Sequence, residues 1–199
     1  MINLELLLTI SSYYFVMYVT PGPNNSILAT SGIKFGFFRT IPNIIGIPVG
    51  HGIQLTLVTL GLGSIFEHYP TIFVLLKYIG ATYLLYLAWK MFGSLNIAKN
   101  ETKASPLKFY EAILFQFVNP KAWVICATAV SLFFPQEENF IFAILFMVTM
   151  STIINLPSIS LWALGGSVIR HYLNNNTIKV AVEWLLAILL VGTAITIII

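Results

Sequence analysis

The chain has 199 residues, of which 58% are hydrophobic and only 9% are charged, and it contains no Asp. A soluble domain carries about 25% charged residues, so this composition argues against a soluble enzyme, a disordered chain and a nucleic-acid-binding module. The net charge of +3 is small and scattered, and it indicates no nucleic-acid partner. The sequence therefore predicts a membrane protein, surrounded mostly by lipid.

Six apolar stretches are long enough to cross a bilayer, for which ~20 residues suffice. Three of them contain no Lys, Arg or Glu, and the others contain few; in chain order they are residues 6–33, 40–66, about 71–92, about 109–134, 139–169 and about 179–198. Unpaired backbone groups are costly in lipid, so each stretch is predicted to be a helix.

The connections between these stretches are short except at residues 93–108, which are polar. We predict a single all-α transmembrane domain over residues 1–199, in which 93–108 is a cytoplasmic hinge between two three-helix repeats, 1–92 and 109–199. Because three is an odd number, the two repeats would be inserted in opposite directions.

The positive charges give the predicted orientation. With six spans, eight basic residues fall on one side of the membrane: Lys34, Arg39, Lys90, Lys99, Lys103, Lys108, Arg170 and Lys179. Positive residues mark the cytoplasmic face. Both termini are therefore expected on the outer face.

The first stretch contains Thr-Pro-Gly-Pro-Asn-Asn at residues 20–25. Pro21 and Pro23 each remove a backbone donor, and Gly22 loosens the helix further. A break near the middle of the membrane is tolerated where protein or a watery cavity satisfies the backbone. The motif predicts either a binding site that includes Asn24 and Asn25 or a kink packed by neighbouring helices.

The fourth stretch contains a corresponding break at Asn119, Pro120 and Lys121. Paired breaks in two inverted halves indicate the binding site of a transporter. A charged residue inside the membrane costs at least ~2.5 kcal/mol on insertion scales and usually faces a cavity or a substrate. Lys121 could receive the carboxylate of a small zwitterion, or it could extend to the cytoplasmic face.

Three other ionisable residues are candidates for proton coupling. His51 lies near the centre of the second stretch, where it could relay protons or bond to a backbone carbonyl. Glu111 and Glu183 lie at the predicted cytoplasmic ends of the fourth and sixth stretches. They are either coupling groups or solvated side chains.

Small residues indicate where helices approach one another closely, and they permit a homodimer without requiring one. The glycines that we expect in such contacts are Gly32, Gly36, Gly46, Gly50 and Gly80.

Motifs for enzymatic chemistry are absent from the sequence. It has no phosphate-binding Gly-x-x-x-x-Gly-Lys-Ser/Thr motif, no His-Glu-x-x-His motif and one cysteine, Cys126. We therefore expect no enzyme activity, no metal site and no cofactor.

Several motifs resemble the LysE/RhtB family of amino-acid exporters. They lie at residues 20–25, 32–52, 76–84 and 116–121, so the resemblance covers essentially the whole chain. The segments 87–90 and 162–166 are most similar to the branch that exports cysteine and O-acetylserine. The resemblance implies a carrier in the bacterial inner membrane that expels small neutral amino acids and is driven by an ion gradient, with the proton as the expected coupling ion.

The leading hypothesis is thus a secondary exporter with alternating access. Its substrate would lie between the first and fourth helices, held by the residues of the two breaks: Pro21, Gly22, Pro23, Asn24, Asn25, Gln116, Asn119, Pro120 and Lys121. A passive pore and a membrane scaffold without transport are the alternatives.

Overall fold

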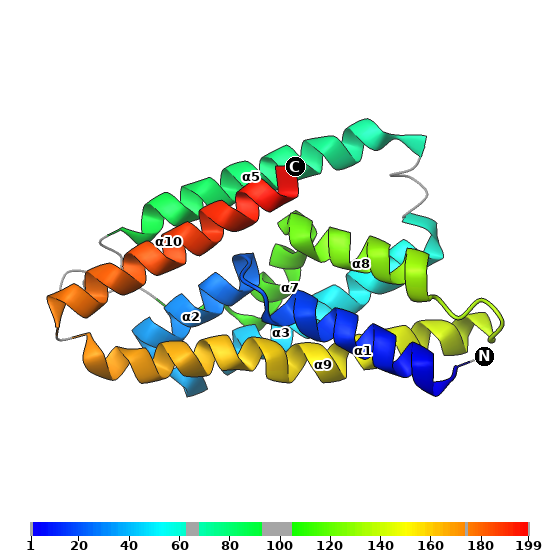
Figure 1. Ribbon diagram of the computed structural model, residues 1–199, viewed down its shortest axis with the longest axis horizontal. Helices are drawn as coiled ribbons and strands as arrows, with labels where there is room; N and C mark the ends of the chain where they lie inside the picture. Colours follow the sequence, from blue (N-terminus) through cyan, green and yellow to red (C-terminus); the bar gives the residue numbers. More distant parts are fainter. Residues whose placement is uncertain (1, 63–67, 93–104, 174, 199) are drawn as a thin grey trace.

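The structure, a computed structural model, describes residues 2–62, 68–92, 105–173 and 175–198. All elements within these ranges are helices, which form an elongated bundle (Figure 1). In chain order they are α1 (Leu4–Val19), α2 (Pro23–Phe35), α3 (Phe37–Leu57), η1 (Val58–Leu62), α5 (Pro70–Met91), α7 (Phe109–Val118), α8 (Pro120–Phe133), α9 (Phe140–Ile169), η2 (Arg170–Tyr172) and α10 (Asn176–Ile198). The prediction of an all-α protein is confirmed.

Helices long and apolar enough to cross a membrane are found at residues 37–62, 140–172 and 176–198. The consecutive helices α7 and α8 together meet the same criteria, although the chain bends by 72° between them. The chain is therefore a membrane protein with three or four spans by these criteria within the described residues. The finer prediction of six spans in two inverted repeats goes beyond this finding, as does a first span that joins α1 and α2.

Local sequence explains where several helices begin. Asn side chains cap α1, α8 and α9 by accepting hydrogen bonds from first-turn amides, and they belong to Asn3, Asn119 and Asn139. Proline occupies the first turn of α2, α5 and α8, where its missing N–H has no helical partner to lose. Thus both predicted break motifs contain the start signal of a new helix.

Gly36 joins α2 to α3 with a backbone φ of 85°. This is a conformation that glycine adopts without steric penalty. Gly36 therefore serves the turn between two helices, rather than the packing contact expected from its spacing to Gly32.

The other predicted packing glycines lie at crossings between helices. A Cβ atom on Gly32 of α2 would be 2.1 Å from the Ala163 carbonyl oxygen of α9. On Gly46 of α3 it would be 2.4 Å from the Phe109 carbonyl oxygen of α7. Similar close approaches involve Gly50 with α7 and Gly80 with Pro120 of α8. These helix backbones approach more closely than a larger residue permits.

Buried residues form two hydrophobic clusters. The larger cluster gathers side chains mainly from α1, α3, α8 and α9, including Tyr14, Leu55 and Met147. The second gathers side chains mainly from α2, α5 and α10, including Leu84 and Leu190.

The two ends of the bundle differ in charge. The ends of α2, α5 and α9 and the start of α10 lie together at one end (Figure 1), which contains Lys34, Lys90, Arg170 and Lys179. At the other end, the backbone N–H of Ile2 donates to Glu138 Oε1 at 3.2 Å. These four basic residues, all predicted to lie on the cytoplasmic side, are thus gathered at one end of the bundle. Most of the predicted hinge, residues 93–108, lies outside the described residues.

Candidate functional site: two helix breaks around Lys121

Pro21 and Pro23 end the first helix by removing two backbone donors. Without their N–H groups, the carbonyls of Met17 and Val19 have no donor four residues further along the chain. The Val19 carbonyl instead accepts a hydrogen bond from the indole Nε1 of Trp162, at 3.1 Å. A side chain of α9 therefore supplies the hydrogen bond that the Val19 carbonyl loses because Pro23 has no N–H.

Asn25 satisfies two further carbonyls at the end of α1. Its Nδ2 donates to the carbonyl oxygens of Tyr18 at 2.8 Å and Thr20 at 2.7 Å. The Asn25 side chain is buried, with 3% of its surface exposed. Its amide thus holds the broken end of α1 against the beginning of α2, and this position was predicted from sequence to bind substrate.

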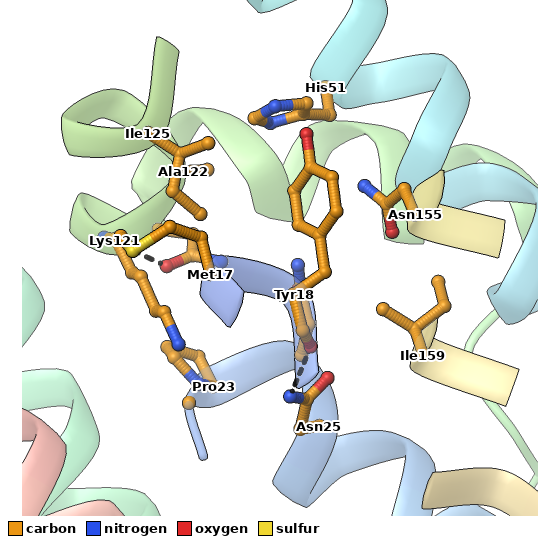
Figure 2. A pocket seen from close by; sticks show the side chains of 13 residues that line it. Met17, Tyr18, Pro23, Asn25, His51, Lys121, Ala122, Ile125, Asn155 and Ile159 are labelled. Atoms are coloured by element: carbon orange, nitrogen blue, oxygen red, sulfur yellow. Dashed lines mark hydrogen bonds between the residues drawn. The ribbon is translucent and has the colours of Figure 1, made fainter. Parts of the chain in front are cut away.

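Lys121 reaches the same break from α8 (Figure 2). Its Nζ donates to the Thr20 carbonyl at 3.0 Å, to Thr20 Oγ1 at 2.8 Å and to the Pro21 carbonyl at 3.0 Å. Its side chain also passes Gly22, where a Cβ would lie 2.9 Å from Lys121 Cδ. All three ammonium hydrogens therefore have neutral oxygen partners at the negative end of the α1 dipole.

The second break, between α7 and α8, is shorter. Pro120 removes the donor for the Gln116 carbonyl, which accepts from Gln54 Nε2 at 3.1 Å and from the Asn119 backbone N–H at 3.1 Å. The Asn119 side chain caps α8 by accepting from the Lys121 backbone N–H at 3.1 Å. A single residue therefore separates the two helices.

The Phe117 carbonyl completes this arrangement. It accepts from the indole Nε1 of Trp123, a residue of α8, at 2.9 Å. The 72° bend is thus stabilised largely by donors from the same pair of helices.

A reciprocal amide pair connects the two broken helices. Asn24 Nδ2 donates to Gln116 Oε1 at 2.9 Å, and Gln116 Nε2 donates to Asn24 Oδ1 at 3.1 Å. Gln116 is fully buried, and its Nε2 also donates to the Ala112 carbonyl at 3.0 Å. The pair links residues 92 positions apart in the sequence, one from each predicted repeat.

A small cavity lies beside the Lys121 ammonium. Its volume of about 20 Å³ is room for one water molecule. Figure 2 shows Lys121 and Asn155 on opposite sides of this cavity, with Tyr18 between them. The lining residues include no Asp or Glu; they are Met17, Tyr18, Gly22, Pro23, Asn24, Asn25, His51, Asn119, Lys121, Ala122, Ile125, Asn155 and Ile159.

Most of the residues predicted to bind substrate therefore meet in one place. Three of the predicted set are not among the lining residues: Pro21, Gln116, which contacts Asn24, and Pro120, which packs against Gly80. Pro21 contributes its carbonyl to Lys121.

His51 lines the same cavity from α3 and is buried, with 2% of its surface exposed. Its ring nitrogens lie 3.7 Å from Cys126 Sγ, and the Tyr18 ring contacts it edge-on with centroids 5.4 Å apart. The ring partner is thus a thiol rather than the backbone carbonyl considered from sequence. A role for His51 in proton coupling stays a prediction.

The two candidate carboxylates lie away from the cavity. Glu111 Oε2 accepts from the Lys108 backbone N–H at 2.8 Å, so its side chain caps α7. Glu183 is buried in α10 and interacts electrostatically with Lys34. Neither lines the space beside Lys121.

Sequence analysis missed two polar residues of the cavity. Tyr18 hydroxyl forms a 2.6 Å hydrogen bond with Ser151 Oγ. Asn155 Oδ1 is buried and has no hydrogen-bond partner within the described part of the chain. The available signal was Asn155 two residues before Pro157 inside an apolar helix, where a polar amide is costly unless it is used.

Apolar helices around a buried cation and two helix ends are features of membrane transport proteins. Residues 15–199 match the sequence family described as LysE type translocator, and the chain belongs to this family. The resemblance drawn from the motifs is therefore confirmed.

Curated relatives agree with this assignment. The chain is 30% identical over 166 residues to the cysteine/O-acetylserine efflux protein of Salmonella paratyphi A, covering 81% of this chain and 84% of the relative. It is 29% identical over 161 residues to the cysteine/O-acetylserine efflux protein of Escherichia coli K12, covering 80% of this chain and 82% of the relative. No solved structure matches the chain.

Proposed function

We propose that this protein is a secondary transporter of the bacterial inner membrane that exports small neutral amino acids of the cysteine and O-acetylserine type. Family membership and the names of both relatives support export of such a substrate. The expected coupling ion is the proton, exchanged for the amino acid across the membrane.

The observation that carries this proposal is the bonding of Lys121. Its ammonium has three neutral oxygen partners, and the lining of the neighbouring cavity includes no acidic residue. A buried cation without an anionic partner favours a carboxylate ligand. The substrate carboxylate would replace the oxygens of Thr20 and Pro21 on Lys121.

The start of α2 also favours a substrate carboxylate on this side of the cavity. Among the described residues no side chain caps this helix, whose first turn contains Asn24 and Asn25, and both residues line the cavity. First-turn amides and the positive end of the helix dipole attract anions. On the opposite side, the unpaired Asn155 Oδ1 is a suitable acceptor for the substrate ammonium.

The small size of the cavity supports transport by alternating access. A space of about 20 Å³ holds one water and not an amino acid, so the described conformation must open before substrate binds. The contacts that would separate are the hydrogen bonds of Lys121 to the end of α1. Breaking them in the absence of substrate leaves buried groups unpaired, which couples opening to binding.

The inverted repeat, with α1 and α2 together as the first span, is supported by which helices contact one another. The first span packs on α9, the fifth span, and α7 of the fourth span packs on α3, the second. Exchanging the two three-helix groups converts each contact into the other. The contacts of α5 with α10 and of α3 with α9 are unchanged by the same exchange.

The orientation follows from the basic end of the bundle. We propose that the end containing Lys34, Arg170 and Lys179 faces the cytoplasm and that both termini face outward. A homodimer is compatible with this orientation and is not required by it.

The test is transport by the purified protein in proteoliposomes with labelled O-acetylserine. We expect uptake or efflux that saturates and that accelerates when a pH gradient is imposed. Flux proportional to concentration without saturation would instead indicate a pore. The absence of flux of O-acetylserine and cysteine in vesicles that contain folded protein would contradict the proposal and favour a scaffold.

A further inference from the structure

A second cleft lies at the basic end of the bundle, separate from the cavity at Lys121. It has a volume of about 240 Å³, enough for a small amino acid with several waters. Its walls come from α2, α5, α10 and the segment 105–107. A cleft of this size is already open in the conformation in which the Lys121 cavity is closed.

Helix α2 gives this cleft a polar wall. Ser26, Thr30 and Lys34 line it at intervals of four residues, so they lie one above another on the same helix face. The opposite walls are apolar, with Leu87 of α5 and Leu190 of α10. A polar stripe of this kind is unusual within an apolar bundle and needs a polar occupant.

Ser26 provides independent support for an occupant. Its side chain is buried with 2% of its surface exposed, and its Oγ has no hydrogen-bond partner among the residues that the structure describes. A buried hydroxyl without a partner is destabilising. The Thr30 hydroxyl, one turn further, donates to the Ser26 carbonyl at 2.8 Å. A ligand that bonds to Ser26 Oγ would remove the cost of leaving that group unpaired.

The charges near Lys34 favour an anionic group. Lys34 interacts electrostatically with the carboxylate of Glu183 and with the ammonium of Lys90. Two cations and one anion leave a net positive charge at the end of the polar stripe. A zwitterion would place its carboxylate there.

The cleft also ends close to the Lys121 site. On α10, Leu190 lines the cleft. One turn further, the Thr193 hydroxyl, which donates to the Leu189 carbonyl at 2.8 Å, also contacts the Pro21 carbonyl at 3.3 Å. The same carbonyl accepts from Lys121 Nζ at 3.0 Å. A contact between Thr193 and the first helix break therefore separates the cleft from the Lys121 site.

We propose that this cleft is a second amino-acid site, occupied from the cytoplasm before the substrate reaches Lys121. The carboxylate of the bound amino acid lies toward Lys34, and its polar groups bond to Ser26 and Thr30. Release of the Thr193 contact with Pro21 then connects the two sites. This inference rests on the proposed function, because it assigns the same substrate and the same direction of transport.

Cysteine labelling tests the proposal. Cys126 is the only cysteine in the chain and is replaced by Ser in the background. Thr30→Cys is then exposed to a membrane-impermeant maleimide in inside-out vesicles and, separately, in intact cells. We expect labelling from the cytoplasmic side only. O-acetylserine at ten times its Kd should slow labelling about tenfold, since occupancy leaves roughly one site in eleven free.

The matched control is Thr56→Cys on α3. Thr56 makes the same hydrogen bond to the carbonyl four residues back, at 2.9 Å, but lies outside the cleft. Thr56 lies in the last turn of α3, toward the proposed outer face, so Thr56→Cys is labelled in intact cells, and that labelling should not respond to O-acetylserine. Ser26→Cys provides a second position in the cleft if Thr30→Cys does not fold.

Transport by the same vesicles distinguishes the possible failures. Transport is measured on the cysteine variants before labelling. If they transport O-acetylserine but the substrate does not protect Thr30→Cys or Ser26→Cys from the maleimide, the proposal of a second site is wrong and the proposed export function is unaffected. Labelling from the outer side only contradicts the second site equally. If the unmodified protein transports no amino acid, the proposed function itself fails.

Discussion

The two helix breaks differ in where their hydrogen-bond partners come from. At the break between α1 and α2, the partners of the free carbonyls come from α2, α8 and α9, through Asn25, Lys121 and Trp162. At the break between α7 and α8, Asn119 and Trp123 supply partners from within the same pair of helices, and Gln54 adds one from α3. Beside the local Asn25, the first break depends on the distant residues Lys121 and Trp162, whereas the second is largely stabilised by donors from its own pair of helices.

This difference indicates which break can change during transport. A helix end whose partners belong to other helices loses them when those helices move, so its stability depends on conformation. A helix end that carries its own cap keeps it throughout. We therefore interpret the end of α1 as the part whose hydrogen bonds to Lys121 are replaced by the substrate. The bend at Asn119 keeps its structure and fixes the direction of the Lys121 side chain.

The largest loss of stability is expected for Asn25→Leu. The change leaves the Tyr18 carbonyl without the Asn25 donor, and a buried unpaired group costs about 1–3 kcal/mol. The Thr20 carbonyl also loses Asn25 and keeps Lys121 as its donor. The purified variant should unfold at a clearly lower temperature than the wild type in the same detergent. Asn176→Leu, at the exposed start of α10, is the control and should change little. Equal melting temperatures for the two variants would contradict the role of Asn25.

A pair of glycine variants compares the breaks directly. Alanine at Gly80 would place its Cβ 2.3 Å from Pro120 Cγ, in a rigid ring, whereas at Gly22 it would lie 2.9 Å from Cδ of the flexible Lys121 side chain. Gly80→Ala should therefore lower stability by about 1–3 kcal/mol. Gly22→Ala should fold normally and reduce transport, because it displaces Lys121. Thermal unfolding and transport rates are measured on both variants. A loss of stability in Gly22→Ala, together with normal stability in Gly80→Ala, would contradict this comparison.

A smaller effect on stability is expected for Asn119→Ala. Loss of the cap on α8 costs about 1 kcal/mol. Because the cap fixes the direction of Lys121, transport should fall much more than stability does. Asn139→Ala removes the equivalent cap of α9, far from the cavity lining, and should leave transport intact. Similar transport by the two variants would mean that the cap at Asn119 has no special role.

Some of these features could be predicted from sequence because they depend on short-range chemistry. Proline at residues 21, 23 and 120 and the uncommon lysine at 121 indicated the helix ends, and these residues do meet in the structure. Glycine spacing likewise indicated positions where helix backbones approach, although Gly36 proved to form a turn.

Other features depend on contacts across the bundle, which one sequence does not specify. Asn25 and Asn24 are adjacent and chemically identical, yet one bonds to the end of α1 and the other to Gln116 of α7. Trp162 and Asn155 lie on a long apolar helix whose inward face cannot be chosen without knowing its neighbours. Glu111 had a local explanation that sequence analysis overlooked, since it lies three residues after the N-cap of α7.

The central claim, that Lys121 binds the substrate carboxylate, is tested most directly by binding affinities measured in a double-mutant cycle. Wild type and Lys121→Gln are each titrated with O-acetylserine and with its carboxamide, which lacks the negative charge. We expect either change alone to weaken binding about 10- to 100-fold, because a hydrogen bond to a charged group contributes about 1.5–3 kcal/mol. Both changes together should cost little more than one. Losses that simply multiply would show that Lys121 and the carboxylate act independently, and would contradict the account.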